Sequence, residues 1–352
     1  MLPEPQTREE FQQRYPAVYF LDAGDLAGLA AYLHNRGWIG PEERLRGAGK
    51  AGEGNMNYTL RVTTSERSFI LKQARPWVEK YPHIAAPRER ALVEGRFYEA
   101  VSADPELAAM MPGLLGLDAA SHILALEDLG EAQDFTMLYQ GAALAEAQTD
   151  ALADYLSKLH RSPGDADRKN AFANRAMRAL NHLHIFEFPL QLENGFDLDA
   201  ITPGLNEPAR SLKLDQGYIS TVKSLGELYL RDGDALLHGD YFPGSWLKTA
   251  RGLRVIDAEF CFYGPPEFDL GVAIAHLHLA NQRVGLIQRF LGSYRPARPL
   301  HHELVWQLAG VEIMRRLIGV AQLPIQFDLE QKTALLKLSR EMVLTPRQGV
   351  ER

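Results

Sequence analysis

Three acidic residues follow short apolar segments in the second half of the chain, and their positions suit a specific chemistry. Asp240 closes the run His238–Asp240, while Asp257 and Glu259 follow an apolar pair at 255–256. Short apolar runs broken by glycine and proline predict strands that give way to loops. A hydroxyl that attacks a γ-phosphate needs a proton acceptor, and the phosphates need cations held by further carboxylates. The spacing therefore indicates metal-assisted phosphoryl transfer.

The three carboxylates divide these roles between them. Asp240 is the predicted proton acceptor, and Asp257 with Glu259 is the predicted magnesium pair. Because alternate residues of a strand face the same side, these two carboxylates are expected to point together, away from Ala258. Two hard oxygen ligands on one side suit Mg²⁺. The alternative interpretation is that all three are exposed loop acids, as most carboxylates are.

A glycine-rich segment at 45–57 precedes an alternating strand at 58–62. Glycine has no Cβ, so the backbone amides of such a loop can approach phosphate oxygens. The nucleotide-binding residues predicted in this segment are Gly52, Gly54, Asn55 and Asn57. No Gly-Lys followed by Ser or Thr closes the segment, which disfavours P-loop ATPases. An ordinary hairpin turn is the alternative, since glycine clusters mark turns generally.

Two further segments offer an ion pair that would serve the same chemistry. The apolar strand at 68–72 ends in Lys72, and apolar spacing predicts a helix over 87–101 that carries Glu94. A lysine that ends such a strand can contact the α and β phosphates, and a helix glutamate can orient it. Another amphipathic helix is predicted over 25–36 from its apolar spacing.

Composition and charge exclude several classes of protein. The 352 residues are 46% hydrophobic and 24% charged, which excludes disordered and fibrous chains and suits two lobes around one cleft. A net charge of −7 without a concentrated Lys/Arg run disfavours nucleic acid as a partner. No apolar segment is long enough to span a bilayer and no signal-peptide pattern opens the chain, so a cytoplasmic protein without a membrane partner is expected. The single cysteine, Cys261, excludes an internal disulfide and a Cys-rich zinc site.

The acidic motifs carry a resemblance to a known group of enzymes. His238–Asp240 with Asp257–Glu259 resembles the catalytic and metal loops of the aminoglycoside phosphotransferase, choline kinase and methylthioribose kinase group, which shares the protein-kinase fold. The longer runs Val255–Pro265 and Phe268–Gly271, and the segment Lys72–Val78, are similar to methylthioribose kinases in particular. The resemblance implies an α+β fold of two lobes. The N-terminal, nucleotide-binding lobe of antiparallel sheet and helix would occupy residues 1–129, and the mainly helical lobe residues 130–352.

The resemblance selects among the acids of the predicted helix and assigns a hinge. The family's glutamate follows an Arg-Ala pair, here Arg90–Ala91, which favours Glu94 over Glu89 and Glu99. Residues 122–130 end in two acids and a glycine and resemble the hinge between the lobes. The resemblance implies that adenine binds to the backbone there. The two residues that would offer a carbonyl and an N–H are Glu127 and Leu129.

A helix predicted over 312–321 contains the adjacent pair Arg315 and Arg316 in mainly apolar surroundings. Burial of a guanidinium without an acid partner is costly, so the pair indicates contact with an anion or substrate. Arginines that snorkel to the surface are the alternative. Methylthioribose kinases have a similar Arg-Arg-Ile-Gly segment, and the resemblance implies that both arginines contact substrate and the transferring phosphate.

The chain also departs from that family after the catalytic aspartate. The run Tyr241–Pro243 replaces the usual Leu-His-Thr, so the substrate-facing wall, with Tyr241 as a predicted contact, is altered. Ser245 stands where most relatives place a metal-binding asparagine, and it is the third predicted Mg²⁺ ligand.

Residues 164–234 give little functional signal. His182 and His184 are two residues apart and would not share a helix face, so no zinc site is expected there. His160 ends a predicted helix and is expected to pack or cap rather than to act in catalysis.

The resulting hypothesis is an ATP- and Mg²⁺-dependent small-molecule kinase. The predicted acceptor is 5-methylthioribose, phosphorylated at the anomeric hydroxyl. Two alternatives stay open: a kinase of another small alcohol (an aminoglycoside, an amino alcohol or another sugar), and a catalytically inactive nucleotide-binding regulator of the same fold. A homodimer also stays open.

Overall fold

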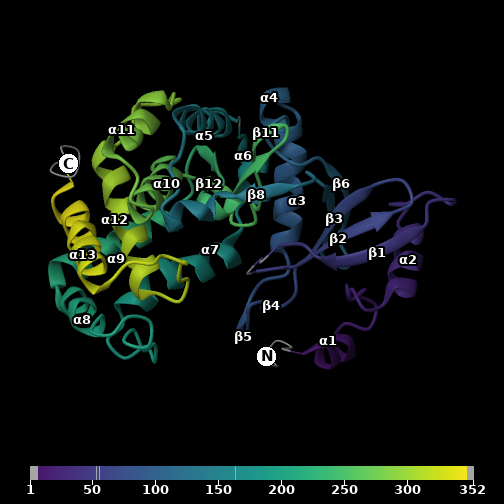
Figure 1. Ribbon diagram of the computed structural model, residues 1–352, viewed down its shortest axis with the longest axis horizontal. Coiled ribbons are helices and arrows are strands. Elements are labelled where there is room, and N and C mark those ends of the chain that lie inside the picture. Colours follow the sequence, from purple (N-terminus) through teal and green to yellow (C-terminus); the bar gives the residue numbers. More distant parts are fainter. Residues whose placement is uncertain (1–6, 53, 55, 163, 347–352) are drawn as a thin grey trace. The chain divides into compact units, whose positions relative to one another are not determined.

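A computed structural model describes residues 7–52, 54, 56–162 and 164–346 of the chain. Within these residues the chain forms two units, one that ends at Glu131 and one that begins at Ala132 (Figure 1). Among the residues described, no helix is long and apolar enough to cross a membrane.

The first unit is built on an antiparallel sheet of five strands in the order β1-β2-β3-β7-β6. The strands are β1 (Leu45–Lys50), β2 (Tyr58–Thr64), β3 (Ser68–Gln73), β6 (Leu114–Asp118) and β7 (Ile123–Glu127). In β2 the residues alternate, with Leu60 and Val62 buried and Arg61 exposed, as a sheet with one covered face requires. Those two side chains belong to a core that also contains Leu29 and Leu33 of α2 (Leu26–Asn35).

Helix α3 (Arg90–Ser102) packs against β6 and β7 of this sheet. The contact is close at Gly95, where a Cβ would lie 3.1 Å from methyl carbons of both Leu117 and Leu124. A glycine there lets the helix approach the sheet, which brings the neighbouring Glu94 to β3. The remaining elements of the unit are α1 (Arg8–Arg14), β4 (Trp77–Val78), β5 (Tyr81–Ala85) and α4 (Pro105–Ala108).

The second unit is mainly helical, with one small sheet of three short strands and another of two. Its strands are β8 (Ala132–Asp134), β9 (Ala235–Leu237), β10 (Trp246–Thr249), β11 (Gly252–Val255) and β12 (Phe262–Gly264). Its helices are η1 (Phe135–Gln140), α5 (Glu146–Leu159), α6 (Ala166–Ala171), α7 (Arg175–His182), η2 (Leu183–Glu187), η3 (Phe188–Leu190), α8 (Asn206–Leu214), α9 (Gln216–Tyr229), η4 (Pro243–Ser245), α10 (Glu267–Leu279), α11 (Val284–Ser293), α12 (His302–Ile318) and α13 (Leu329–Leu344).

Helices α10, α12 and α13 form the centre of this unit. Helix α10 is buried on all sides, so it has no polar face, as expected of a central helix. A Cβ on Gly271 of α10 would lie 2.8 Å from the Leu308 side chain of α12, and one on Gly310 of α12 would lie 2.7 Å from the Ser339 carbonyl oxygen of α13. Glycines therefore set both close helix crossings. The predicted α+β class, an antiparallel-sheet region followed by a larger helical region, is confirmed.

Candidate active site

The candidate catalytic loop begins where β9 ends. Strand β9 pairs with β12, Leu237 opposite Phe262, and the next three residues are His238–Asp240. Gly239 has φ +85°, and a Cβ there would lie 2.2 Å from the Phe260 carbonyl oxygen. Only glycine fits this turn, because any other residue would clash with backbone and occupy a left-handed conformation. The turn delivers Asp240 to the loop.

A carboxylate to which the sequence analysis gave no role holds the backbone of this loop. Asp269, in the first turn of α10 and fully buried, accepts the backbone N–H of His238 at 2.7 Å and that of Gly239 at 3.0 Å. Its third partner is Nε2 of His160 at 3.1 Å, and Nδ1 of His160 lies 2.9 Å from the hydroxyl of Tyr294. His160 is thus a buried histidine at the C-cap of α5 that supports the loop, in agreement with the packing role expected for it.

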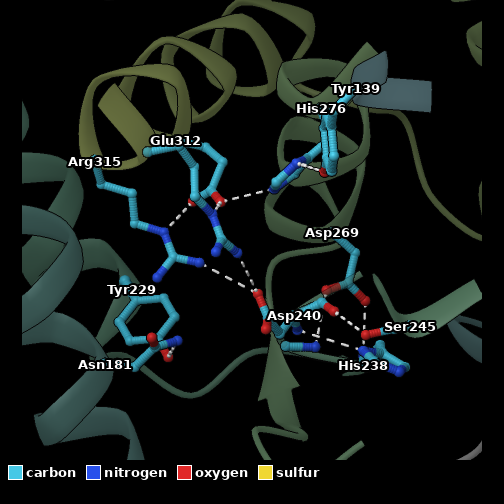
Figure 2. Close-up of polar contacts among 12 residues, drawn as sticks. Tyr139, Asn181, Tyr229, His238, Asp240, Ser245, Asp269, His276, Glu312 and Arg315 are labelled. Atoms are coloured by element: carbon cyan, nitrogen blue, oxygen red, sulfur yellow. Dashed lines mark hydrogen bonds and ion pairs between the residues drawn. The ribbon is translucent and has the colours of Figure 1, made fainter. Parts of the chain in front are cut away.

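The two arginines of α12 lie at Asp240. Nη2 of Arg315 donates to Oδ1 of Asp240 at 3.2 Å, and Nη2 of Arg316 donates to the same oxygen at 3.1 Å. On their other side, Nε of each arginine donates to Glu312, at 2.6 Å from Arg315 and 2.7 Å from Arg316. Figure 2 shows Asp240 and Glu312 on opposite sides of the Arg315 guanidinium group. These four residues are called the arginine cluster below.

Two more side chains extend the cluster away from Asp240. Nε2 of His276 lies 3.0 Å from Oε1 of Glu312, and Nδ1 of His276 lies 2.5 Å from the hydroxyl of Tyr139 (Figure 2). Phe242 packs against both Arg316 and His276. The guanidinium carbon of Arg316 lies 4.8 Å from its ring centre, and the ring centre of His276 lies 5.2 Å from it. The guanidinium is thereby stacked as well as hydrogen-bonded.

The electrostatics of the cluster follow from its burial. Burial raises the pKa of Asp240, while the positive charges of Arg316 and Arg315 act against that rise. Burial would also raise the pKa of Glu312, but the two arginines and the hydrogen bond from His276 hold it well below its usual value. Burial lowers the pKa of His276 to about 4. A neutral imidazole therefore faces a carboxylate that stays ionised.

The prediction that a strand carries Asp257 and Glu259 is wrong. Strand β11 ends at Val255, and Asp257 has φ +75°, which turns the chain out of the extended conformation. After this turn both Ala258 and Glu259 are buried. A left-handed non-glycine residue is strained, and such strain is typical of functional loops.

The loop that carries Asp257 is tied to the catalytic loop by hydrogen bonds. Nε2 of His238 lies 2.9 Å from the carbonyl oxygen of Ile256. The hydroxyl of Ser245 donates to the carbonyl oxygen of Asp240 at 3.1 Å, and the carbonyl oxygen of Ser245 accepts the N–H of Ile256 at 3.0 Å. Ser245 thus joins the loops of both aspartates.

The donor set in these loops fits Mg²⁺. It consists of the hard oxygen ligands predicted from the sequence, namely Asp257, Glu259 and Ser245. The part of the chain that the structure describes has no group of three or more His, Cys, Asp or Glu residues that could hold a metal. A magnesium ion bound to nucleotide needs only one or two carboxylates, because it keeps several waters and takes the rest of its ligands from phosphates.

The first unit contains the predicted lysine–glutamate pair. Nζ of Lys72 on β3 lies 2.8 Å from Oε1 of Glu94 on α3, and both side chains are buried. Of the three glutamates weighed from the sequence, Glu94 is the one that contacts Lys72; Glu99, further along α3, is exposed.

Residues of the predicted glycine-rich loop are held by Arg90, an arginine to which the sequence analysis gave no binding role. Arg90 is fully buried and donates from Nε to Asn57 Oδ1 at 2.9 Å and from Nη2 to the Met56 carbonyl at 2.9 Å. Its Nη1 donates to the carbonyl oxygen of Arg75 at 2.9 Å. Asn55, also predicted to bind nucleotide, lies outside the described residues. The other two predicted loop residues are Gly52, with φ +70°, and Gly54.

The predicted hinge follows β7. The N–H of Glu127 donates to the Gly113 carbonyl at 2.8 Å, and Leu129 lies in the segment after the strand. Arg61 fastens that segment, since its Nη2 donates to Asp128 at 3.0 Å and to the Gly130 carbonyl at 3.0 Å.

Tyr241 does not join the other predicted site residues. Its side chain is fully buried, its hydroxyl donates to the Leu152 carbonyl at 3.0 Å, and its ring stacks on that of Tyr155. The prediction of Tyr241 as a substrate contact is therefore corrected: the chain turns its side chain into the core. The next residue, Phe242, packs on Arg316 instead.

Similarity to known proteins extends over most of the chain. Residues 49–301 match the model of a family described as the phosphotransferase enzyme family. The methylthioribose kinase of Exiguobacterium sibiricum is 28% identical over 336 residues, which cover 81% of this chain and 82% of that enzyme. The methylthioribose kinase of Pectobacterium carotovorum is 29% identical over 266 residues; the match covers 70% of this chain and 64% of that enzyme. The structure of an ethanolamine kinase from Plasmodium vivax shares the fold, with a TM-score of 0.54 at 12% identity over 97% of this chain and 98% of that one.

Proposed function

This chain belongs to the phosphotransferase enzyme family, and we propose that it transfers the γ-phosphate of ATP to the anomeric hydroxyl of 5-methylthioribose. The family predicted from the motifs is thus confirmed, and the protein is an ATP-dependent kinase of small molecules. The acceptor is our proposal, supported by the distant similarity to methylthioribose kinases.

One observation carries the proposal: a partly buried aspartate, Asp240, with two guanidinium groups on one of its carboxylate oxygens. Its other oxygen, Oδ2, accepts no hydrogen bond from the described residues, and 21% of the side chain is exposed. This oxygen is the group that would receive the proton of the acceptor hydroxyl. Burial favours the protonated form of the carboxyl, so it makes Asp240 a better proton acceptor than an exposed aspartate.

Positive charge beside Asp240 suits the rest of the reaction. As the hydroxyl oxygen bonds to the γ-phosphorus and the bond to the bridging oxygen of ADP breaks, negative charge is spread over the phosphoryl oxygens. Arg315 and Arg316 would stabilise that charge in a buried site, where electrostatic effects are strong. Each keeps its Nη1 without an acceptor among the residues described.

The remaining roles fall to the loops and to the first unit. We assign the nucleotide phosphates to Lys72 and to the loop that contains Gly52 and Gly54. Asp257 and Glu259, with Ser245, would hold Mg²⁺, which neutralises phosphate charge when it is bound. Glu127 and Leu129 would present their backbone to the adenine.

The arginine cluster also bears on the choice of acceptor. An aminoglycoside or an amino alcohol carries positive charge, and a site for it would favour acids that are not already paired. Here the two acids of the cluster, Asp240 and Glu312, are balanced by two guanidinium groups. This favours a neutral sugar over the cationic alcohols.

The test is ADP release with ATP and Mg²⁺ against methylthioribose, other pentoses, amino alcohols and aminoglycosides, followed by ³¹P NMR of the product. We expect turnover with methylthioribose and a phosphate on the anomeric carbon. Turnover with another acceptor alone would reject the sugar assignment, and absence of turnover across the panel would favour a nucleotide-binding role without catalysis.

A further inference from the structure

Glu312 lies in the arginine cluster but is too far along the chain from the acidic motifs to be part of them. It precedes Arg315 by three residues and Arg316 by four on α12, so all three side chains share one helix face. Each oxygen of Glu312 accepts one Nε–H, from Arg315 at 2.6 Å and from Arg316 at 2.7 Å. Its side chain is 2% exposed.

This arrangement limits how the arginines can bind Asp240. A guanidinium usually grips a carboxylate with two nitrogens on two oxygens. Here both Nε groups are engaged by Glu312, and each arginine reaches Asp240 only through Nη2, at 3.2 and 3.1 Å from the same oxygen, Oδ1. The second oxygen of Asp240 is thereby left for an acceptor hydroxyl.

The partners of Glu312 fix its orientation in turn. Glu312 stays ionised because its pKa is held well below the usual value, so its oxygens only accept hydrogen bonds. Nε2 of His276, 3.0 Å away, must then carry the proton, and with a pKa lowered to about 4 the ring is neutral, so Nδ1 is the acceptor. The hydroxyl of Tyr139, 2.5 Å from Nδ1, is therefore the donor. Hydrogen bonds are therefore donated in one direction, from Tyr139 to His276 and from His276 to Glu312.

We propose that Glu312 is a positioning residue of the transfer reaction, oriented by Tyr139 through His276. It separates the two guanidinium groups from Oδ2 of Asp240 and keeps them available for phosphoryl charge. Without it, the arginines would close on both oxygens of Asp240 and block the proton acceptor. This inference rests on the proposed function, since it assigns Asp240 the proton.

Two variants test the proposal by kinetics with ATP, Mg²⁺ and methylthioribose. Glu312→Gln leaves one accepting oxygen and places an NH2 group against an arginine, so kcat should fall about 100-fold with the KM for ATP unchanged. Tyr139→Phe removes the hydroxyl that donates to Nδ1 of His276. The ring is then no longer held in one tautomer, and kcat should fall about fivefold.

Matched controls separate positioning from loss of packing. Tyr218→Phe also removes a buried hydroxyl, one that lies 2.8 Å from Oγ of Ser339, and it should leave kcat unchanged. His278→Leu alters a second histidine of α10, whose Nε2 is buried with no hydrogen-bond partner among the described residues, and it should leave kcat unchanged as well. If Glu312→Gln does not fold, the comparison of kcat between Tyr139→Phe and Tyr218→Phe decides whether the proposal holds.

A second readout does not depend on turnover. In protein labelled with ¹⁵N-arginine, the Nε–H signals of Arg315 and Arg316 should be shifted downfield and exchange slowly. Tyr139→Phe should move both signals, and Tyr218→Phe should move neither. Unchanged signals in Tyr139→Phe, wild-type kcat in Glu312→Gln, or equal kcat losses in Tyr139→Phe and Tyr218→Phe would overturn the proposal. Wild-type protein that phosphorylates no acceptor while these signals behave as expected would instead reject the proposed function alone.

Discussion

The two units bury their functional cations in different ways. In the first, Lys72 pairs with Glu94, a carboxylate from a neighbouring helix. In the second, Arg315 and Arg316 share two carboxylates, Asp240 and Glu312, so neither arginine is fully bound by either acid. The pair in the first unit joins a strand to a helix, whereas the shared arrangement divides two cations between the proposed proton acceptor and a second acid that holds them. The difference teaches that the second unit can hold two guanidinium groups beside Asp240 without engaging both oxygens of that carboxylate.

The largest effect is expected where the shared arrangement is broken. Arg316→Met leaves Asp240 and Glu312 with one cation between them, and we expect kcat to fall about 10³-fold, as for other arginines that stabilise phosphoryl transfer. Loss of one partner from a buried ionic group should also lower the free energy of unfolding by about 3–5 kcal/mol. Steady-state kinetics and urea unfolding measure both.

The control for that variant is Arg340→Met, which breaks an exposed ion pair with Asp215. Exposed pairs contribute about 0–1 kcal/mol, so its unfolding curve and kcat should match the wild type. Equal losses of kcat and of unfolding free energy in the two variants would show that the arginine cluster contributes no more to activity and stability than an exposed ion pair does.

A smaller effect is expected in the first unit. Glu94→Gln removes the negative charge that Lys72 faces on α3 but no group from the acceptor side, so we expect kcat to fall about 100-fold through misplacement of the phosphates. Glu99→Gln changes an exposed glutamate of the same helix and serves as control. If Glu94→Gln retains wild-type kcat, Lys72 does not need orienting.

Arg90→Lys should separate nucleotide binding from transfer. Lysine cannot reach the Asn57 side chain and the two carbonyls of Met56 and Arg75 with fixed geometry, so the glycine-rich segment should loosen. We expect the KM for ATP to rise about tenfold with little change in kcat. The control is Arg96→Lys, which changes an exposed arginine of α3. A fall in kcat at constant KM would contradict this division between the units.

The smallest effect is a dependence of stability on pH. Burial lowers the pKa of His276 and of His278 to about 4, below the unfolded value of 6.5. Between these values the unfolded chain binds more protons, so the free energy of unfolding should fall as the pH drops from 6.5 to 4, by up to about 1.4 kcal/mol per pH unit for each histidine. His278→Leu should make this slope shallower by one group's share; an unchanged slope would contradict the burial of neutral histidine.

Local patterns predicted much of the fold. Alternation over 58–62 and the apolar run that ends in Lys72 correspond to β2 and β3, because a sheet with one covered face imposes that period. The pattern failed at Asp257, where a left-handed residue ends the alternation two residues after β11. It failed also at Tyr241, since nothing in the sequence tells which of two neighbouring aromatic residues turns into the core.

The site residues that the sequence analysis did not identify differ in how readily a sequence pattern could have pointed to them. Glu312 stands three and four residues before the arginines, so helical spacing alone could have paired them. Asp269 lay inside a motif whose role was not assigned. His276 and Tyr139 are 137 residues apart in the chain and meet only through tertiary packing, which no local pattern encodes.

The central claim is that Asp240 receives the proton of the acceptor while the nucleotide is bound elsewhere. The most direct measurement compares kcat with methylthioribose and the Kd for ATP and Mg²⁺, by calorimetry, in the wild type and in Asp240→Asn. We predict that the variant loses about 10³-fold or more in kcat and binds ATP with unchanged affinity. Wild-type turnover in Asp240→Asn, or a loss explained by weaker ATP binding, would contradict the claim.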